Sequence, residues 1–316
     1  MVCRLNSFLR LTPTLLLALF AIKVAPAIAQ TATLQPGAAQ NEQVKPGEQW
    51  VRLKFDQQQK PVALEVAIVR YVLPKYARQP AARVREYVDL VGAVHIGDRR
   101  YYDQLNRRFR TYNALLYELV APEGTVVEKG RGTSNTHPLG ALQNGLKTML
   151  DIEHQLEQID YTRPNFVHAD FSPDEFMKSM ENRDEGFAQL YFRMIGQALA
   201  QQSQQSAQGE SADLDILGAL FSRDRPRKLK IALAKQFESL EEALASLSGP
   251  EGSTLITERN KRALEVLRQQ QKLGKRRIGI FYGAGHLSDM HDRLVNDFGL
   301  KPISIEWLEA WDLRPK

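Results

Sequence analysis

The chain has 316 residues, of which 43% are hydrophobic and 25% are charged. This length and composition exclude a disordered, fibrous or small disulfide-rich protein, and they suffice for a sizeable hydrophobic core. The formal net charge is +5, but residues 1–29 contain three basic side chains and no acidic one. The rest of the chain is close to neutral, so its charge gives no reason to expect a nucleic-acid partner.

Residues 1–29 have the pattern of an export signal. Arg4 and Arg10 precede an uninterrupted apolar run at 15–22, and residues 27–29 (Ala-Ile-Ala) form a small-x-small cleavage site. The run is far shorter than the roughly 20 residues that span a bilayer. We therefore expect cleavage after Ala29, no stable membrane span afterwards, and a periplasmic or secreted protein; an uncleaved anchor is the alternative.

The remaining chain has the pattern of a flexible leader at 30–48 and a single domain at 49–316. The domain's first two apolar stretches form a predicted hairpin, and later runs that are apolar on both faces are typical of buried parallel strands. We expect strands at 50–55, 62–72, 87–94, 114–120, 277–282 and 302–308. We expect helices at 98–110, 138–158, 185–200, 227–248 and 253–272, a capped one from Ser172, and one that closes at Gly299.

This order of elements predicts an α/β fold with a mixed, largely parallel central sheet. Its middle, at about 138–272, is expected to be a helical insertion. Within that insertion, residues 201–213 are rich in Gln and Ser and are too polar to pack, so we expect a mobile surface loop there.

A seven-residue motif occurs twice and is the most specific feature of the sequence. Residues 92–98 (Gly-Ala-Val-His-Ile-Gly-Asp) match residues 283–289 (Gly-Ala-Gly-His-Leu-Ser-Asp). Each copy follows a predicted strand and precedes a helix, and the strand after each helix contains a glutamate, Glu118 or Glu306. The chain thus repeats a strand–GxxH–helix–strand–Glu unit.

The repeat predicts a shared site, because crossover connections bring the carboxyl ends of parallel strands to one edge of a sheet. Gly92 and Gly283 permit a tight turn or a close backbone approach there. We expect four side chains to converge at that edge: His95, Glu118, His286 and Glu306.

These residue types favour a divalent metal site. A helix N-terminus favours neutral imidazole, the form that binds a metal or acts as a general base. We expect Mn²⁺, Co²⁺ or Zn²⁺ to be held by His95, His286 and Glu118, with a water at an open position. Glu306 would complete the shell or act as general base. The structural alternatives are strand-end histidines, and glutamates paired with a nearby arginine.

Several other polar residues are weaker candidates. Asp98 and Asp289 complement the dipoles of the helices that follow them, or support a metal ligand from behind. His168 and Asp170 lie on a short apolar run; a satisfied core histidine is the favoured interpretation and entry into the site is the alternative. His137 is a candidate for closing over a substrate.

Two histidines are not candidates for the site, and several known catalytic and binding motifs are absent from the sequence. His154 and His291 are expected on helix surfaces. The chain has no serine nucleophile elbow, HExxH motif, phosphate-binding glycine loop or paired CxxC motif. Their absence excludes serine hydrolases of that type, standard zincins, P-loop enzymes and zinc ribbons.

The two GxxH motifs, the segment Tyr117-Glu118-Leu119 and the segment Thr257-Glu258-Arg259-Asn260 resemble the TraB/GumN/TIKI superfamily. They resemble erythromycin-esterase-like and ChaN-like proteins more distantly. The resemblance runs from about residue 88 to 307, and the middle matches only as mostly helical. It implies a metal-dependent protease of the TIKI kind, with Arg259 as a site residue that stabilises an oxyanion or orients a carboxylate.

Together, the motifs and the resemblance predict an exported metal-dependent hydrolase that acts on a peptide or a small ester. The likeness to erythromycin esterases implies an alternative in which a histidine is the general base and no metal is needed. The likeness to ChaN-like proteins implies another, a non-catalytic envelope protein that binds haem or a peptide.

Overall fold

The computed structural model describes residues 44–122, 124–125, 127, 150, 152–183, 185, 219, 222, 224–247 and 252–315. The predicted signal segment, the first part of the leader, His137 and the loop at 201–213 lie outside these residues. In the described part of the chain, no helix has both the length and the apolar character that crossing a membrane requires.

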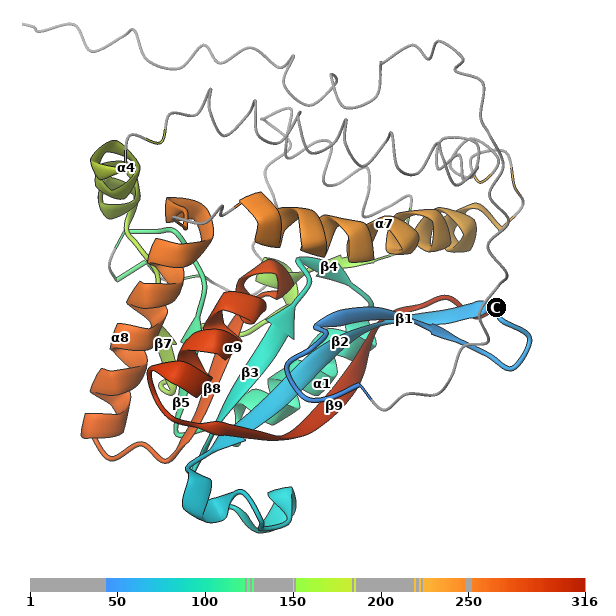
Figure 1. Cartoon of the computed structure of the whole chain (residues 1–316). Helices are drawn as coiled ribbons and strands as arrows, with labels where there is room; N and C mark the ends of the chain where they lie inside the picture. Colours follow the sequence, from blue (N-terminus) through green and yellow to red (C-terminus); the bar gives the residue numbers. More distant parts are fainter. Residues whose placement is uncertain are drawn as a thin grey trace, which may run out of the picture.

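A seven-stranded mixed sheet forms the centre of the fold (Figure 1). Strands β3, β8, β5 and β7 lie side by side in that order and run parallel, whereas β2 is antiparallel to its three neighbours. The predicted α/β class and the predicted hairpin are therefore confirmed. The strands are β1 (Val51–Phe55), β2 (Pro61–Val72), β3 (Tyr87–Ala93), β5 (Ala114–Tyr117), β7 (Phe166–His168), β8 (Arg277–Gly283) and β9 (Lys301–Asp312).

Strand β9 lies farther from the centre than the repeat suggested. It pairs with β2 along almost the whole length of that strand, while β1 and β3 pair with the two halves of β2. Since a strand has only two edges, β1 and β3 share one edge and β9 takes the other. Strand β2 thus separates β9 from β3.

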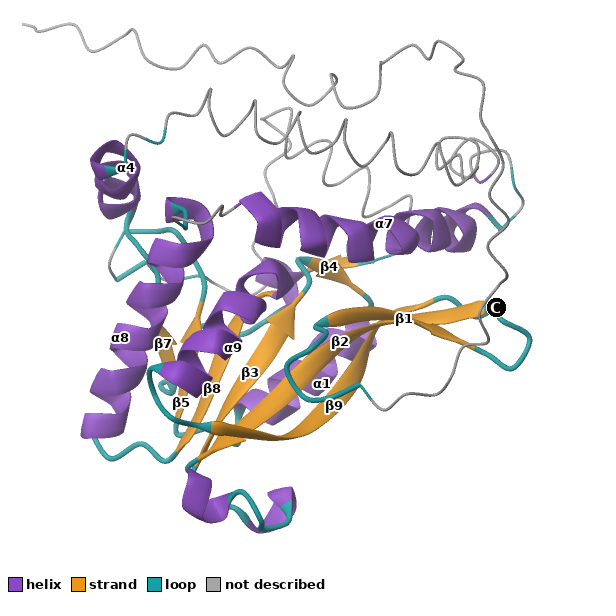
Figure 2. Ribbon diagram, in the orientation of Figure 1, coloured by secondary structure: helices purple, strands orange, loops and turns teal. Residues whose placement is uncertain are grey.

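Helices cover both faces of the sheet and form two layers of core (Figure 2). Helix α1 (Arg99–Phe109) packs on one face with Val91, and α8 (Arg259–Lys272) and α9 (Leu287–Asn296) pack on the other with Leu90. Adjacent strand residues point to opposite faces, so apolar runs such as Leu90-Val91 require helices on both sides.

The middle of the chain is not purely helical, which corrects that prediction. Strand β7 pairs with β5 inside the main sheet, and β6 pairs with β4 (Ile96–Gly97), which follows the first histidine motif. Phe166 on β7 packs against Phe109 and Tyr117, so this apolar run completes the core. The other elements here are β6 (Glu153–His154), α3 (Gln155–Gln158), α4 (Pro173–Asn182), whose capping box is confirmed, and α7 (Arg225–Leu247).

The last residues of the predicted leader are part of the fold. Gly47 has a φ of +97°, and a Cβ there would lie 2.1 Å from the imidazole of His291. The hydroxyl of Tyr71 lies 2.7 Å from Nδ1 of His291, and Trp50 packs beside that ring. His291 is therefore half-buried rather than on a helix surface, and His154, which lies on β6, is also partly buried.

The first motif glycine is needed for strand packing. A Cβ at Gly92 would lie 2.4 Å from Cγ1 of Val66 and 3.2 Å from the carbonyl oxygen of Ala67. We expect Gly92→Ala to lower the free energy of unfolding by about 1–3 kcal/mol, because the core is overpacked there. Urea unfolding measures this loss, and the loss should shrink in a Val66→Ala background. Equal losses in both backgrounds would contradict the steric explanation.

Candidate functional site

Three neighbouring strands end together and bring the two motifs side by side. In the parallel register, Ala93 of β3 lies opposite Gly283 of β8, and Tyr117 of β5 lies opposite Phe281. The carboxyl ends of β3, β8 and β5 therefore meet at one edge, as the repeat predicted. His95, Glu118 and His286 follow directly from these strand ends.

Gly283 lies at the centre of this group, which we call the Gly283 site. A Cβ at Gly283 would lie 3.2 Å from Oε2 of Glu118, 3.8 Å from Cδ2 of His286 and 3.9 Å from Nε2 of His95. A side chain at this position would thus press on the carboxylate. Gly92 leaves space for residues of the core, whereas Gly283 leaves space for residues of the site.

Glu118 is held as a carboxylate by a cation and a backbone amide. Its Oε1 accepts a hydrogen bond from Nη2 of Arg259 at 2.7 Å, and its Oε2 accepts one from the backbone N–H of Gly283 at 2.7 Å. Burial alone would raise the pKa of Glu118. The charges of protonated His286, of Arg259 and of His95 outweigh it and lower this pKa to about 2. Glu118 is therefore ionised at neutral pH.

Arg259 forms a second buried ion pair behind Glu118. Its Nε and Nη2 donate to the two carboxylate oxygens of Asp170 at 2.9 and 2.6 Å, and the side chain of Asp170 is 0% exposed. Arg259 begins α8, directly after the π-helical segment η4 (Thr254–Glu258). Its guanidinium is shared between two carboxylates and is 8% exposed, so it holds Glu118 in place rather than meeting a substrate.

The hydrogen bonds of His286 define its tautomer. The side-chain NH₂ of Asn260 donates to the carbonyl oxygen of His286 at 2.9 Å and to Oδ2 of Asp289 at 2.8 Å. The amide oxygen of Asn260 must then accept from Nδ1 of His286, which lies 2.7 Å away. Nε2 therefore carries a lone pair, 3.4 Å from Nη1 of Arg259. Asp289 supports His286 through Asn260.

Burial keeps His286 neutral and makes stability depend on pH. It lowers the pKa of His286 to about 4 from the ordinary 6.5, against the negative charge of Glu118. The unfolded chain therefore takes up this proton at higher pH than the folded one. We expect the free energy of unfolding to fall by about 3 kcal/mol as the pH drops from 6.5 to 4.

Glu118 adds a loss in the same direction below its ordinary pKa of 4.5, as the pH falls toward 2. Urea unfolding at pH 7, 5.5 and 4.5 measures the His286 contribution. His286→Gln, which has no titrating ring at this position, should reduce the slope of the curve above pH 4.5, while the half-buried His291, whose pKa burial also lowers, keeps part of it. An unchanged slope in that variant would contradict the assignment.

His95 is the exposed member of the site. It lies between β3 and β4, and its carbonyl oxygen accepts from the backbone N–H of Gln155 at 2.9 Å. This bond fixes the backbone, while the imidazole is open to solvent on the side of Gly283. Of the two motif histidines, His95 is the one that solvent can reach.

The described residues do not fit the predicted metal site in this arrangement. Nε2 of His286 and Oε1 of Glu118 are 3.6 Å apart, close to the roughly 3.4 Å between two ligands of a tetrahedral ion. However, Arg259 lies against both atoms, and its permanent positive charge opposes a cation there. Among the described residues, no three His, Cys, Asp or Glu side chains form a metal-holding group.

Glu306 does not join the site, which corrects the expected convergence of four side chains. It lies in the middle of β9 opposite Ile68 of β2, and its carboxylate pairs with Arg108 of α1. The second repeat unit therefore differs from the first, because its last strand pairs beyond β2 instead of joining β8 or β3.

Two weaker candidates have structural partners. Nζ of Lys230 donates to Asp98 at 2.6 Å, so this carboxylate anchors α7 and does not cap α1 with its side chain. Nε2 of His168 lies 2.6 Å from the carbonyl oxygen of Leu119 and donates to it. That bond satisfies its ring N–H, as the favoured interpretation expected, although the side chain is only partly buried and not in the core.

Asp170 and Asn260 belong to the site, but no sequence pattern marked Asn260, and Asp170 was only a weak candidate. Asp170 is a carboxylate in the apolar run that includes Phe166 and Val167, the same signal that singled out Glu118. Asn260 lies within the segment that carried the family resemblance, but nothing local marks an asparagine as the partner of a distant histidine.

The site thus contains an exposed histidine, an ionised buried glutamate and a neutral buried histidine. An Arg259–Asp170 pair holds the glutamate in place behind them. Comparison of the chain with protein-family models, with curated proteins and with solved structures gave no match.

Proposed function

We propose that the chain hydrolyses ester or peptide bonds at the Gly283 site, with His95 as the general base. One observation carries the proposal: an exposed imidazole and an ionised, largely buried carboxylate, Glu118, both lie within 4 Å of the point that a Cβ at position 283 would occupy. The pattern of residues 1–29 supports export, so we propose that the protein acts in the periplasm or outside the cell.

The proposed reaction uses these residues in separate roles. His95 accepts a proton from water as the water oxygen attacks the carbonyl carbon, and it later returns the proton to the leaving group. The negative charge of Glu118 stabilises the imidazolium that forms. The first N–H groups of η5 (Ala284–His286) have no partner within that helix and suit the developing oxyanion.

The buried residues act as positioning groups. His286 remains neutral, and its Nε2 accepts a hydrogen bond from Nη1 of Arg259. Arg259 also donates to Oε1 of Glu118 and so holds this carboxylate in position. Asp170 balances the positive charge of Arg259, so Arg259 does not fully compensate the negative charge of Glu118, which can act on His95. In this proposal the exposed His95 is the general base and the buried His286 is a positioning group.

The test is turnover by the purified full chain on a panel of aryl esters and short peptides, with and without chelator. We expect turnover in chelator. Loss of turnover that Mn²⁺, Co²⁺ or Zn²⁺ restores would overturn the metal-free mechanism in favour of the metal-dependent one. No turnover on any substrate, together with a Soret band on adding haem, would favour the haem-binding alternative.

A further inference from the structure

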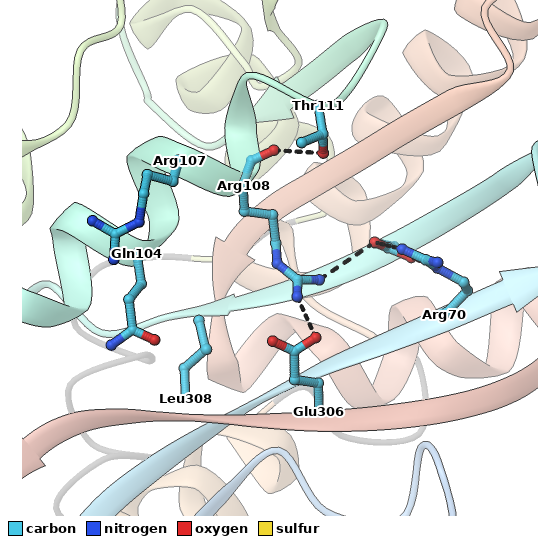
Figure 3. A pocket seen from close by; sticks show the side chains of 8 residues that line it. Arg70, Gln104, Arg107, Arg108, Thr111, Glu306 and Leu308 are labelled. Carbon is cyan, nitrogen blue, oxygen red and sulfur yellow. Dashed lines mark hydrogen bonds and ion pairs between the residues drawn. The ribbon is translucent and has the colours of Figure 1, made fainter. Parts of the chain in front are cut away.

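A second group of charged side chains lies toward the start of β3, away from the Gly283 site. It lines a pocket of about 490 Å³ between α1 and β9, which we call the α1–β9 pocket (Figure 3). This volume lies within the range of small-molecule sites. The lining residues are Arg70, Asp89, Gln104, Arg107, Arg108, Thr111, Glu306 and Leu308.

One wall of the pocket is a satisfied, buried ion pair. Nε and Nη2 of Arg70 donate to the two oxygens of Asp89 at 2.8 and 2.9 Å, and the hydroxyl of Tyr112 donates to Oδ2 at 2.9 Å. The side chain of Asp89 is 1% exposed. Because Asp89 already has these donors, it does not depend on Arg108, which lies 3.8 Å away.

Arg108 instead pairs with Glu306, a carboxylate that is exposed enough to turn away into solvent. Its side chain is 22% exposed, and it pairs with Glu306, whose side chain is 52% exposed. Glu306 can turn into water at little cost, since an exposed ion pair contributes little free energy. Arg108 is held between α1 and β9 and would then offer its planar donors to another acid.

The pocket has one positive charge in excess. Its three guanidinium groups face two carboxylates. Arg107 and Gln104, one turn apart on α1, have no side-chain hydrogen bond or ion pair within the described part of the chain. Both lie on one side of Arg108 in Figure 3, and the apolar side chain of Leu308 lies between Gln104 and Glu306.

We propose that the α1–β9 pocket binds a small monocarboxylate, which replaces Glu306 as the partner of Arg108. The guanidinium fork matches a carboxylate in two parallel hydrogen bonds, and the negative charge of the acid takes the place of the Glu306 charge that turns into water. Arg107 and Gln104 supply the unused donors, and Leu308 contacts the apolar part of the acid. This site is independent of the proposed hydrolysis.

Isothermal titration of the full chain with propionate and with benzoate tests the proposal, with propionamide, benzamide and inorganic phosphate as comparison probes. We expect both acids to bind and both amides to fail. Arg108→Gln should weaken binding by at least about tenfold, and Arg107→Gln by about two- to fivefold. Glu306→Gln should tighten binding by about two- to fivefold, because the competing carboxylate is gone.

Matched controls remove the same charges elsewhere on the same elements. Arg100→Gln on α1 and Glu309→Gln on β9 should leave the affinity within about twofold, since neither residue lines the pocket. If Arg108→Gln does not fold, the Glu306 and Arg107 variants decide. The proposal is overturned if the amides bind as well as the acids, if only phosphate binds, if no acid binds at about 10 mM, or if the controls match the pocket variants.

Discussion

Replacing His95 with alanine is expected to lower kcat/KM for ester or peptide hydrolysis by about a hundred- to ten-thousandfold, the usual contribution of a general base. The free energy of unfolding should change by less than about 0.5 kcal/mol, because the His95 imidazole is exposed. A large kinetic effect with a small effect on stability separates a catalytic role from a structural one. Initial rates and urea unfolding measure the two quantities on the same preparations.

His168→Gln is the control for this result. Glutamine retains an N–H donor for the carbonyl oxygen of Leu119, which is the contact that His168 makes. We expect kcat/KM to stay within a few-fold of the value for the unsubstituted chain, because substitutions away from the reacting groups have small effects. Activity that survives in His95→Ala would refute the assignment of the base, whatever the control shows.

Replacing Arg259 with methionine should produce the largest loss of stability. It leaves the carboxylates of Glu118 and Asp170 without their shared cation, and both side chains are largely buried. Breaking a buried pair from one side costs about 3–5 kcal/mol, because an uncompensated charge stays in the interior. Urea unfolding at pH 7 measures the loss.

The double variant Arg259→Met/Asp170→Leu tests the physical reason. Removing Asp170 as well eliminates one of the stranded charges, so we expect the double variant to recover part of the loss. Its activity should remain low, because Glu118 still lacks its positioning partner. A double variant that is less stable than Arg259→Met alone would show that Asp170 stabilises the fold in some other way.

Local patterns in the sequence predicted the core of the fold and three residues of the site. Apolar alternation marked β1, a long run rich in β-forming residues marked β2, two-sided apolar runs marked β3, β5 and β8, and the repeated motif marked the ends of β3 and β8. These signals work because each depends only on neighbouring residues and on the side-chain period of a strand. His95, His286 and Glu118 could be predicted for that reason.

The features of the fold and of the site that local patterns did not predict depend on pairings between distant segments. The repeat suggested that Glu306 would copy Glu118, but the register of β9 with β2 puts it opposite Ile68 and beside Arg108. Residues 166–168 form a strand because they pair with the free edge of β5. Asp170 matters because it pairs with Arg259, which lies far along the chain. None of these choices is visible in a local window.

The sequence by itself determined which residues end the central strands, and therefore which side chains reach the edge of the sheet. Only the tertiary structure decided their exposure, their partners and their charge states. It buried His286, left His95 exposed and set Arg259 against Glu118, where the sequence had favoured a metal ion. The physical reason is that a side chain's charge state and exposure depend on what packs against it, and Asn260, Asp170 and β9 approach from segments that no local pattern connects.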